Sequence, residues 1–362
     1  MRYCQRCILP ENFPGADLDD RGFCAYCRAE RSVASNRERR REALRERFLR
    51  LCDEVRGLQP YDCLVAWSGG KDSTFTLAMM RRRYGLRPLA YTFDNGFVSP
   101  QALDNMSIVS GNLGVDHIIA RPRFDVLRTV FREAAQHGDI YGAKALTRAS
   151  GVCNACMGLA KGIALQLALR NDIPLVVYGW SPGQAPLTAA LLRRPADLCR
   201  AMVEALRAPL QTLGGDETGA YFPTDDDWRR APRVPYDVAP LLFSTYDEET
   251  VIAEVAALGW RRPLDTDPNS TNCLLNSYGN AVHRAMYGFH PYALELANLV
   301  RLGYLDRRVA LARLREPEDP TRVAIVRERL GVSDVEVDAA VAAAGAANES
   351  GAQTVAGGST NA

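Results

Sequence analysis

The distribution of apolar residues along the chain changes near residue 57. From there, short apolar runs alternate with longer stretches in which apolar residues recur at helical spacing. The runs predict strands over 62–67, 87–93, 115–120, 173–180 and 234–244. The stretches before the fourth strand predict helices over 72–84, 100–112, 124–137 and 157–171. This alternation predicts an α/β fold with a doubly wound, parallel five-stranded sheet covered by helices on both faces.

The segments outside this core show other patterns. The first 30 residues have little periodic apolar content and cannot build a core alone, whereas the next segment is a charged helix with one apolar stripe. The last residues are mostly Ala, Gly, Ser and Thr, as in a disordered tail. The predicted division is a cysteine-rich module (1–30), a helical connector (31–57), the core (58–185), a helical excursion or lid (186–232), the end of the core with a helical C-terminal segment (233–330), and the tail (345–362).

The charge of the chain is nearly balanced, with 44 Lys and Arg against 43 Asp and Glu. This balance gives no overall attraction to nucleic acid, so a tRNA partner is less favoured than a small-molecule substrate. No stretch approaches the roughly 18–20 uninterrupted apolar residues of a membrane span, and the N-terminus MRYCQRCILP is too polar for a signal peptide. We therefore expect no membrane partner and a cytoplasmic location, where cysteines more often bind metals or act as catalysts than form disulfides.

Four of the ten cysteines form two close pairs near the N-terminus. Cys4 and Cys7 are followed, after 16 intervening residues, by Cys24 and Cys27. This C-x2-C…C-x2-C spacing is typical of a structural Zn²⁺ site with tetrahedral thiolate ligands, and the intervening Pro and Gly residues allow the necessary turns. The alternative is two redox-active dithiols, which would not need shared turns.

The other six cysteines are spread through the core and the C-terminal half. Cys153 and Cys156 form a third C-x2-C pair, which is expected to open a helix, and Cys273 follows much later. The remaining three stand alone and are expected to be small buried residues: Cys52, Cys63 and Cys199.

The stretch SGGKDST ends the first predicted strand and opens the first predicted helix. Its residues are Ser68, Gly69, Gly70, Lys71, Asp72, Ser73 and Thr74. The glycines let the backbone approach an anion, the hydroxyls and the lysine can bind it, and the helix directs its free N–H groups toward it. A phosphate site is therefore predicted, although it is not the mononucleotide P-loop because G-x4-G-K-S/T is absent. The alternative is a serine-capped helix after a glycine turn.

These seven residues resemble the S-G-G-x-D-S-S/T signature of the PP-loop ATP pyrophosphatases, which have a HUP-like α/β fold. The resemblance implies that ATP is bound with Mg²⁺, that its α–β bond is cut, and that AMP is placed on a carbonyl oxygen of the substrate. It also implies that the loop residues contact the pyrophosphate, with Lys71 and Asp72 as catalytic residues. Further cofactor contacts are expected where the second and fourth strands end, at Phe93, Asp94, Tyr178, Gly179 and Trp180, although strand ends also pack against helices.

The two ends of the chain resemble the N-acetyl sugar amidotransferase family. The cysteine-rich N-terminal segment carries this resemblance together with GFHPYALELANLVRLGYLDRRVALARL over 288–314. The resemblance implies that ammonia comes from a partner glutaminase, because the chain has no glutaminase signature of its own. The acceptor would be an N-acetyl sugar or a uronic acid.

The later cysteines are similar to those of the iron–sulfur tRNA thiolases. That resemblance implies that Cys153, Cys156 and Cys273 hold a [4Fe-4S] cluster with one iron open to carry sulfide. The spacing between the second and third cysteines departs from the family, since the excursion stretches it. Without a cluster, the three residues would form a second zinc site or a buried dithiol. His283 and His290 could join such a site, although a lone His more often makes structural hydrogen bonds.

We therefore expect an ATP-dependent adenylating transferase that replaces a carbonyl or amide oxygen of a small molecule. Sulfur is favoured as the incoming atom because the three later cysteines then have a role, and a sulfur donor would be the partner. The alternatives are amide transfer with a glutaminase subunit, a tRNA thiolase, and a non-catalytic zinc and nucleotide-sensing module. We also expect the chain to form a homo-oligomer.

Overall fold

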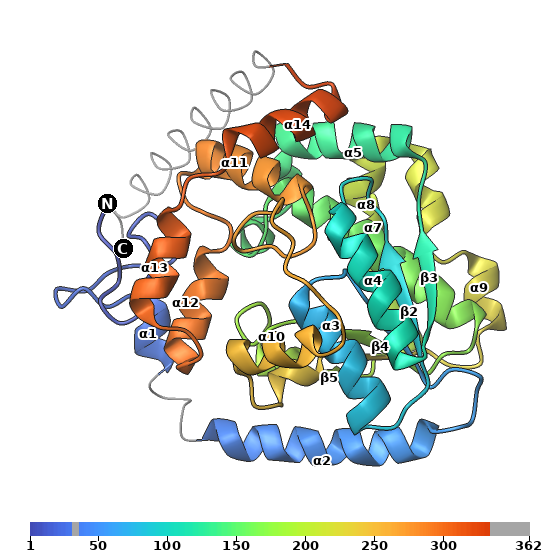
Figure 1. The fold of residues 1–362 in the computed structure, drawn as a ribbon. Helices are drawn as coiled ribbons and strands as arrows, with labels where there is room; N and C mark the ends of the chain where they lie inside the picture. Colours follow the sequence, from blue (N-terminus) through green and yellow to red (C-terminus); the bar gives the residue numbers. More distant parts are fainter. Residues whose placement is uncertain (31–35, 334–362) are drawn as a thin grey trace, which may run out of the picture.

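A six-stranded sheet forms the centre of the computed structural model, which describes residues 1–30 and 36–333 (Figure 1). The strands are β1 (Cys63–Ala66), β2 (Pro88–Phe93), β3 (Asp116–Ala120), β4 (Leu175–Tyr178), β5 (Leu191–Leu192) and β6 (Tyr236–Val238). Their order is β3-β2-β1-β4-β6-β5, and every neighbouring pair is parallel except β5 with β6. The tail predicted over 345–362 lies outside the described residues.

The predicted number of five strands is wrong, because β5 adds a sixth. This strand pairs Leu191 with Val238 and Leu192 with Asp237, and it lies inside the excursion that was predicted to be helical. A two-residue strand is too short to show the alternation by which strands are predicted. The fifth predicted strand is also shorter than expected, because Pro240 begins a 3-10 turn directly after β6.

Helices surround the sheet, and the C-terminal segment is mostly helical (Figure 1). The α-helices are α1 (Ala25–Glu30), α2 (Arg37–Val55), α3 (Lys71–Ala78), α4 (Pro100–Leu113), α5 (Phe124–Gln136), α6 (Ala143–Leu146), α7 (Gly151–Arg170), α8 (Ala196–Gly214), α9 (Asp225–Arg230), α10 (Glu248–Ala256), α11 (Leu275–Tyr287), α12 (Ala293–Leu302), α13 (Arg307–Arg315) and α14 (Pro320–Leu330). Shorter elements are a π-helical turn over Met79–Arg83 and 3-10 turns over Gly138–Ile140, Leu187–Ala189, Asp216–Tyr221 and Pro240–Leu242.

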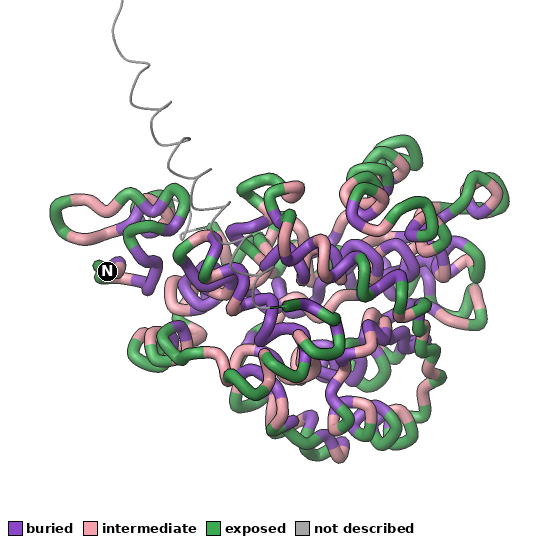
Figure 2. Tube along the Cα trace, turned by 90° about the horizontal axis from the view of Figure 1, so that it is seen from above, coloured by how far each residue is buried: buried purple, intermediate pink, exposed green. Residues whose placement is uncertain are grey.

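Helices cover both faces of the sheet, as the sequence predicts for parallel strands. Residues that alternate along β1 point to opposite faces: Val65 belongs to an apolar cluster with residues of α2, α3, α4 and α10, whereas Leu64 belongs to one with residues of α7. Burial is concentrated in this interior, and exposed residues follow the outer turns of the helices and loops (Figure 2). The central strands β1, β2 and β4 are therefore buried on both faces, which explains why they read as continuous apolar runs, whereas the edge strand β3 is partly exposed.

The strand order reverses between β1 and β4, and this switch point positions the site. The chain runs from β1 outward to β2 and β3, and then returns to place β4 on the other side of β1. Loops that leave two such strands diverge and open a crevice at the carboxyl edge of the sheet. The loop after β1 is SGGKDST, and the loop after β4 begins with Gly179 and Trp180.

Helix α7 begins at Gly151 rather than near residue 157, so the Cys153–Cys156 pair lies in its first two turns. The reason is local, since the side chain of Ser150 accepts the N–H of Cys153 and caps the helix. Its 20 residues and hydropathy of 1.5 satisfy the length and composition of a membrane span, yet 56% of that window is buried inside the protein. Together with its packing on β1 and β4, this burial identifies α7 as a core helix.

The N-terminal module packs against the C-terminal helices α12 and α13. Phe13 and the four N-terminal cysteines share one apolar cluster with Ala297 of α12 and Leu314 of α13. The guanidinium of Arg307 donates hydrogen bonds to the carbonyl oxygens of Cys4 and Cys7 at 3.0 and 2.8 Å. The module is therefore joined to the helical segment that also supplies one wall of the cavity described below.

Candidate functional site

The SGGKDST loop consists of a tight turn over residues 68–70 and the first turn of α3. Gly69 has φ +79°, and a Cβ there would lie 2.5 Å from Cε of Met106, so this position requires glycine. The Ser73 hydroxyl accepts the N–H of Ser68 at 3.2 Å and lies 3.1 Å from the Ser68 hydroxyl. The indole N–H of Trp260 donates to the carbonyl oxygen of Gly69 at 2.9 Å. The loop is thus held in a fixed shape at the start of a helix, which is a geometry suited to a phosphate. The N–H of Lys71 itself donates to the hydroxyl of Thr271 at 3.1 Å.

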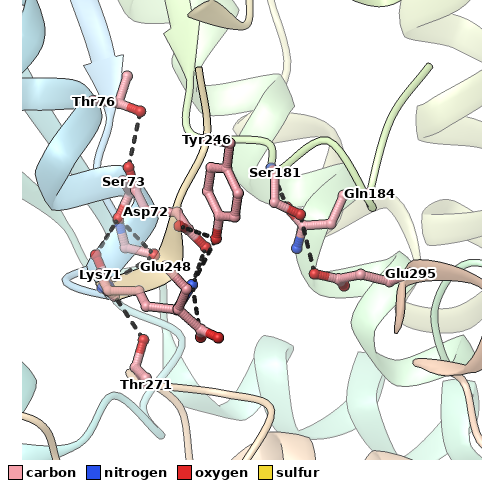
Figure 3. A network of polar contacts seen from close by, with 12 residues as sticks. Lys71, Asp72, Ser73, Thr76, Ser181, Gln184, Tyr246, Glu248, Thr271 and Glu295 are labelled. Atoms are coloured by element: carbon pink, nitrogen blue, oxygen red, sulfur yellow. Dashed lines mark hydrogen bonds and ion pairs between the residues drawn. The ribbon is translucent and has the colours of Figure 1, made fainter. Parts of the chain in front are cut away.

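Lys71 is the centre of a polar network in front of this loop (Figure 3). Its Nζ donates to Asp72 at 2.8 Å and to the hydroxyl of Tyr246 at 3.0 Å, and lies 3.5 Å from a carboxylate oxygen of Glu248. Burial alone would lower the pKa of Lys71, but the charge of Asp72 and its neighbours raises that pKa above the usual value. Arg313 also pairs with Glu248, at 3.0 Å. The ammonium therefore stays charged in a largely dry setting, as a group that binds phosphate must.

The end of β4 lies directly against the loop. A Cβ on Gly179 would lie 2.6 Å from the Cα of Ser73, so only glycine lets β4 approach α3 this closely. The next segment carries Ser181, whose hydroxyl donates to Glu295 of α12 at 3.2 Å (Figure 3). Burial, with a smaller contribution from Asp72, raises the pKa of Glu295 to about 7. A titratable carboxyl group therefore faces the loop from the C-terminal helices.

One cavity of about 1050 Å³ joins the loop to the later cysteines. Among the predicted cofactor and cysteine residues, those that line it are Ser68, Gly70, Lys71, Asp72, Ser73, Phe93, Tyr178, Gly179, Trp180, Cys153, Cys156 and Cys273. The other predicted cofactor contacts are Gly69, Thr74 and Asp94, which lie outside the lining. Thr74 accepts the indole N–H of Trp67 at 2.9 Å, and Asp94 pairs with Arg121 at 2.7 Å. These three residues therefore support the fold around the site.

Cys273 reaches the cavity because its segment is pinned to the loop after β2. Leu274 donates its N–H to the carbonyl of Phe97, and Ser99 donates its N–H to Asn272, both at 2.9 Å. Val98 and Cys273 form an isolated antiparallel bridge. The long sequence separation from Cys156 is therefore closed by backbone contacts.

The side chain of Asn95 links two of the three later cysteines. Its Nδ2 lies 3.3 Å from Sγ of Cys156 and 3.4 Å from Sγ of Cys273, while Cys153 donates to Asn276 at 3.5 Å. Burial raises the pKa of all three thiols, that of Cys153 to about 11. Without a metal the thiols are therefore protonated, and binding a metal would displace their protons.

The N-terminal cysteines converge far more tightly. Their four sulfur atoms lie within 4.8 Å of one another, with 3.7 Å between Cys4 and Cys27 and 3.6 Å between Cys7 and Cys24. Thiolates around one tetrahedral ion with metal–sulfur distances of about 2.3 Å lie roughly 3.8 Å apart, so the arrangement fits a single ion. Hydrogen bonding from Cys24 lowers the pKa of Cys4 and of Cys7, the latter to about 7. In the described residues this quartet is the one group of three or more ligand side chains with such close spacing.

The cavity lining also includes polar residues that were not predicted from the sequence, among them Asn95, Lys161 and Glu295. Asn95 directly follows the predicted contacts Phe93 and Asp94, whereas Lys161 belongs to no motif and Glu295 comes from a helix far from the core in the chain. His283 and His290 do not line the cavity, and burial lowers the pKa of each to about 3. Cys52, Cys63 and Cys199 are buried, as predicted.

Comparisons with known proteins give distant likenesses. No family model matches the chain. An uncharacterized protein of Methanocaldococcus jannaschii is 22% identical over 309 residues, which cover 85% of this chain and 90% of that protein. Among solved structures, the U34-tRNA thiolase NcsA from Methanococcus maripaludis, with its [4Fe-4S] cluster, matches with a TM-score of 0.34 and 14% identity, covering 86% of this chain and 88% of that one. These values are too low for any residue's role to be inferred from the similarity.

Proposed function

We propose that the protein is an ATP-dependent adenylating transferase that replaces a carbonyl oxygen of a small molecule with sulfur. The observation that carries the proposal is the single cavity lined by both the SGGKDST loop and Cys153, Cys156 and Cys273. Activation and replacement of one oxygen require both groups to reach the same carbon atom. A structural cysteine set would not need to open into the cavity of a phosphate loop.

In the first half-reaction, the substrate oxygen bonds to the α-phosphorus of ATP, the α–β bond breaks, and pyrophosphate leaves. Backbone N–H groups at the start of α3 and the Lys71 ammonium stabilise the charge that develops on the pyrophosphate. Mg²⁺ usually takes one or two carboxylates together with phosphate oxygens, and Asp72 and Glu248 are the carboxylates nearest to Lys71.

In the second half-reaction, the sulfur of a hydrosulfide bonds to the activated carbon and loses its proton, the carbon–oxygen bond breaks, and AMP leaves with the original oxygen. Cys153, Cys156 and Cys273 provide three thiol ligands on one wall, which suits a [4Fe-4S] cluster with no fourth protein ligand. When bound, such a cluster supplies an iron at which sulfide is held. Among the described residues, only the N-terminal quartet gathers three or more such ligand atoms within 4.8 Å, so the three cavity thiols would suit a cluster better than a single ion. Glu295 can accept a proton from the incoming sulfur group, because its pKa of about 7 lies near neutrality.

The N-terminal quartet has a structural role in this proposal, with Zn²⁺ as its ion. Its sulfur atoms accept the N–H of Leu9 and of Cys24 and a guanidinium N–H of Arg301, at 3.3 to 3.5 Å. Donors of this kind offset the negative charge of four thiolates on one ion.

The test separates the two half-reactions. Wild-type protein with ATP and a small-molecule cell extract should release pyrophosphate and yield a sulfur-containing product. Cys273→Ser should keep pyrophosphate release and lose the product, because adenylation needs the loop alone. If Cys273→Ser instead keeps full product formation, the sulfur role of the three cysteines is wrong. An amide product that depends on glutamine and a glutaminase would contradict sulfur transfer and support amide transfer.

A further inference from the structure

Lysine is confined to the cavity in this chain. Only three of the 44 basic residues are lysines, namely Lys71, Lys144 and Lys161, and all three line the cavity. A lysine differs from an arginine because its compact ammonium binds an anion as a point charge and its pKa responds to burial. Lys71 belongs to the phosphate loop, and Lys144 is exposed on α6. Lys161 has no part in the two half-reactions described above.

Lys161 is a cation without a bonded counter-charge. It lies on α7 beyond Cys156, and its Nζ is 5.3 Å from the ring centroid of Trp180. Among the described residues, no hydrogen bond or ion pair engages this nitrogen, and the nearby carboxylate of Asp237 is already paired with Arg194. Burial lowers the pKa of Lys161, and Arg194 lowers it further, against the attraction of Asp237. An anion in the cavity would relieve this cost of burial.

A flat aromatic wall adjoins this ammonium. The rings of Tyr178 and Trp180 stack with 5.7 Å between centroids and 21° between planes, and both residues line the cavity. Met202 and Leu206 of α8 add apolar surface to the same cavity. A ligand that fits this part of the cavity has a flat or apolar body and an anionic group.

We propose that Lys161, Tyr178 and Trp180 form the substrate subsite, and that the substrate carries a ring and a carboxylate or phosphate group. This inference rests on the proposed function for the fate of the substrate, but binding at the subsite needs no ATP. The location supports it, because Gly179 separates the two aromatic residues and lies against Ser73 of the phosphate loop. A ligand on this wall therefore lies beside the loop that activates it.

The test measures binding of three small probes by titration calorimetry at pH 7. Phenylacetate and phenyl phosphate present the two anions on the same ring, and phenylacetamide is the uncharged match of phenylacetate. Wild-type protein should bind at least one anion about tenfold more tightly than phenylacetamide, since hydrogen bonds to charged groups are stronger than those between neutral ones. Lys161→Met should remove this preference and Lys161→Arg should keep part of it. Lys144→Met should change it less than about twofold, because an exposed charge is screened.

Two results would overturn the subsite. One is equal binding of phenylacetate, phenyl phosphate and phenylacetamide to the wild-type protein. The other is that Lys161→Met weakens binding of a non-hydrolysable ATP analogue and leaves the anion preference intact, which would assign Lys161 to ATP. Loss of pyrophosphate release with an intact anion preference would contradict the proposed function and support the subsite.

Discussion

The two cysteine sites of this protein are built in opposite ways. The N-terminal quartet is closed, since its sulfur atoms lie within 4.8 Å of one another and all four residues are buried. The later cysteines, Cys153, Cys156 and Cys273, are only partly buried and line a cavity of about 1050 Å³. A closed site offers a metal no free position, whereas an open one leaves room for a reacting group. This difference is the basis on which we propose a structural role for the quartet and a chemical role for the cavity cysteines.

Helix α12 connects these two sites. One side of it packs against the N-terminal module through Ala297, and Glu295 on the other side lines the cavity. Loss of the quartet should therefore affect the folded state as a whole, and loss of a cavity cysteine should affect only the reaction.

The largest expected effect is the loss of stability when the quartet is broken. Cys7→Ser should lower the free energy of unfolding by at least about 4 kcal/mol, because metal binding there is coupled to folding. The matched change Cys153→Ser should cost no more than about 1 kcal/mol, because that thiol lies at the cavity wall. Urea unfolding with a metal assay measures both, and equal losses for the two variants would contradict the division between the sites.

The next effect concerns the phosphate loop, which the reaction in the cavity requires and the N-terminal quartet does not. Lys71→Ala and Asp72→Ala should each reduce pyrophosphate release by about 100-fold or more, because the charge on the leaving group loses a preorganised partner. The metal content of the N-terminal quartet should not change. Lys144→Ala, on the exposed side of the same cavity, is the control. Retained release in both loop variants would show that the loop does not bind pyrophosphate.

Glu295 allows a pH test of the helix that links the sites. Its pKa is raised from 4.5 to about 7 in the folded protein, so the folded state binds more protons than the unfolded state between these values. Its contribution to stability therefore falls as pH rises through this window. Glu295→Gln should remove that fall. The free energy of unfolding of the variant relative to the wild type should therefore be about 2 kcal/mol higher at pH 8 than at pH 5.

Urea unfolding at the two pH values measures this gain. Glu248→Gln is the opposite control, because Lys71 and Arg313 lower the pKa of Glu248 despite its burial. Its carboxylate stabilises the fold above the unfolded pKa, so this variant should lose stability at pH 8. A pH dependence unchanged by Glu295→Gln would show that this group does not titrate near neutrality.

The smallest expected effect concerns the amide that links two cavity thiols. Asn95→Ala removes the contacts to Cys156 and Cys273 and the acceptor for the N–H of Phe97 at 2.9 Å. The loss should be about 1–2 kcal/mol of stability, together with faster alkylation of both cysteines. Asn12→Ala, which removes an exposed amide contact between the N-terminal module and Gly288, should cost less. Unchanged alkylation rates would mean that Asn95 does not hold the thiols.

The quartet and the loop could be predicted from the sequence because their spacing is local. SGGKDST and the C-x2-C pairs are short motifs whose geometry follows from neighbouring residues. Parallel strands and their helices were also predictable from apolar runs, apart from the two-residue β5, which depends on pairing with β6.

The rest of the cavity depends on tertiary contacts that no local pattern contains. Glu295 arrives through the packing of α12, and Cys273 through backbone bonds to the loop after β2. The early start of α7 was predicted only in part: Cys153–Cys156 was expected to open a helix, but the stretch after Ser150 is rich in small residues and has no apolar period that would place its first residue. Lys161 was missed because an isolated lysine carries no signal until its surroundings are known.

The iron content of anaerobically purified protein tests the central claim that the cavity cysteines carry the sulfur chemistry. The account predicts a brown protein that absorbs near 400 nm and holds about four iron atoms per chain in addition to one zinc. Cys273→Ser should lose the iron and keep the zinc, whereas Cys7→Ser should lose the zinc. A colourless wild-type protein with one zinc and no iron would contradict the account.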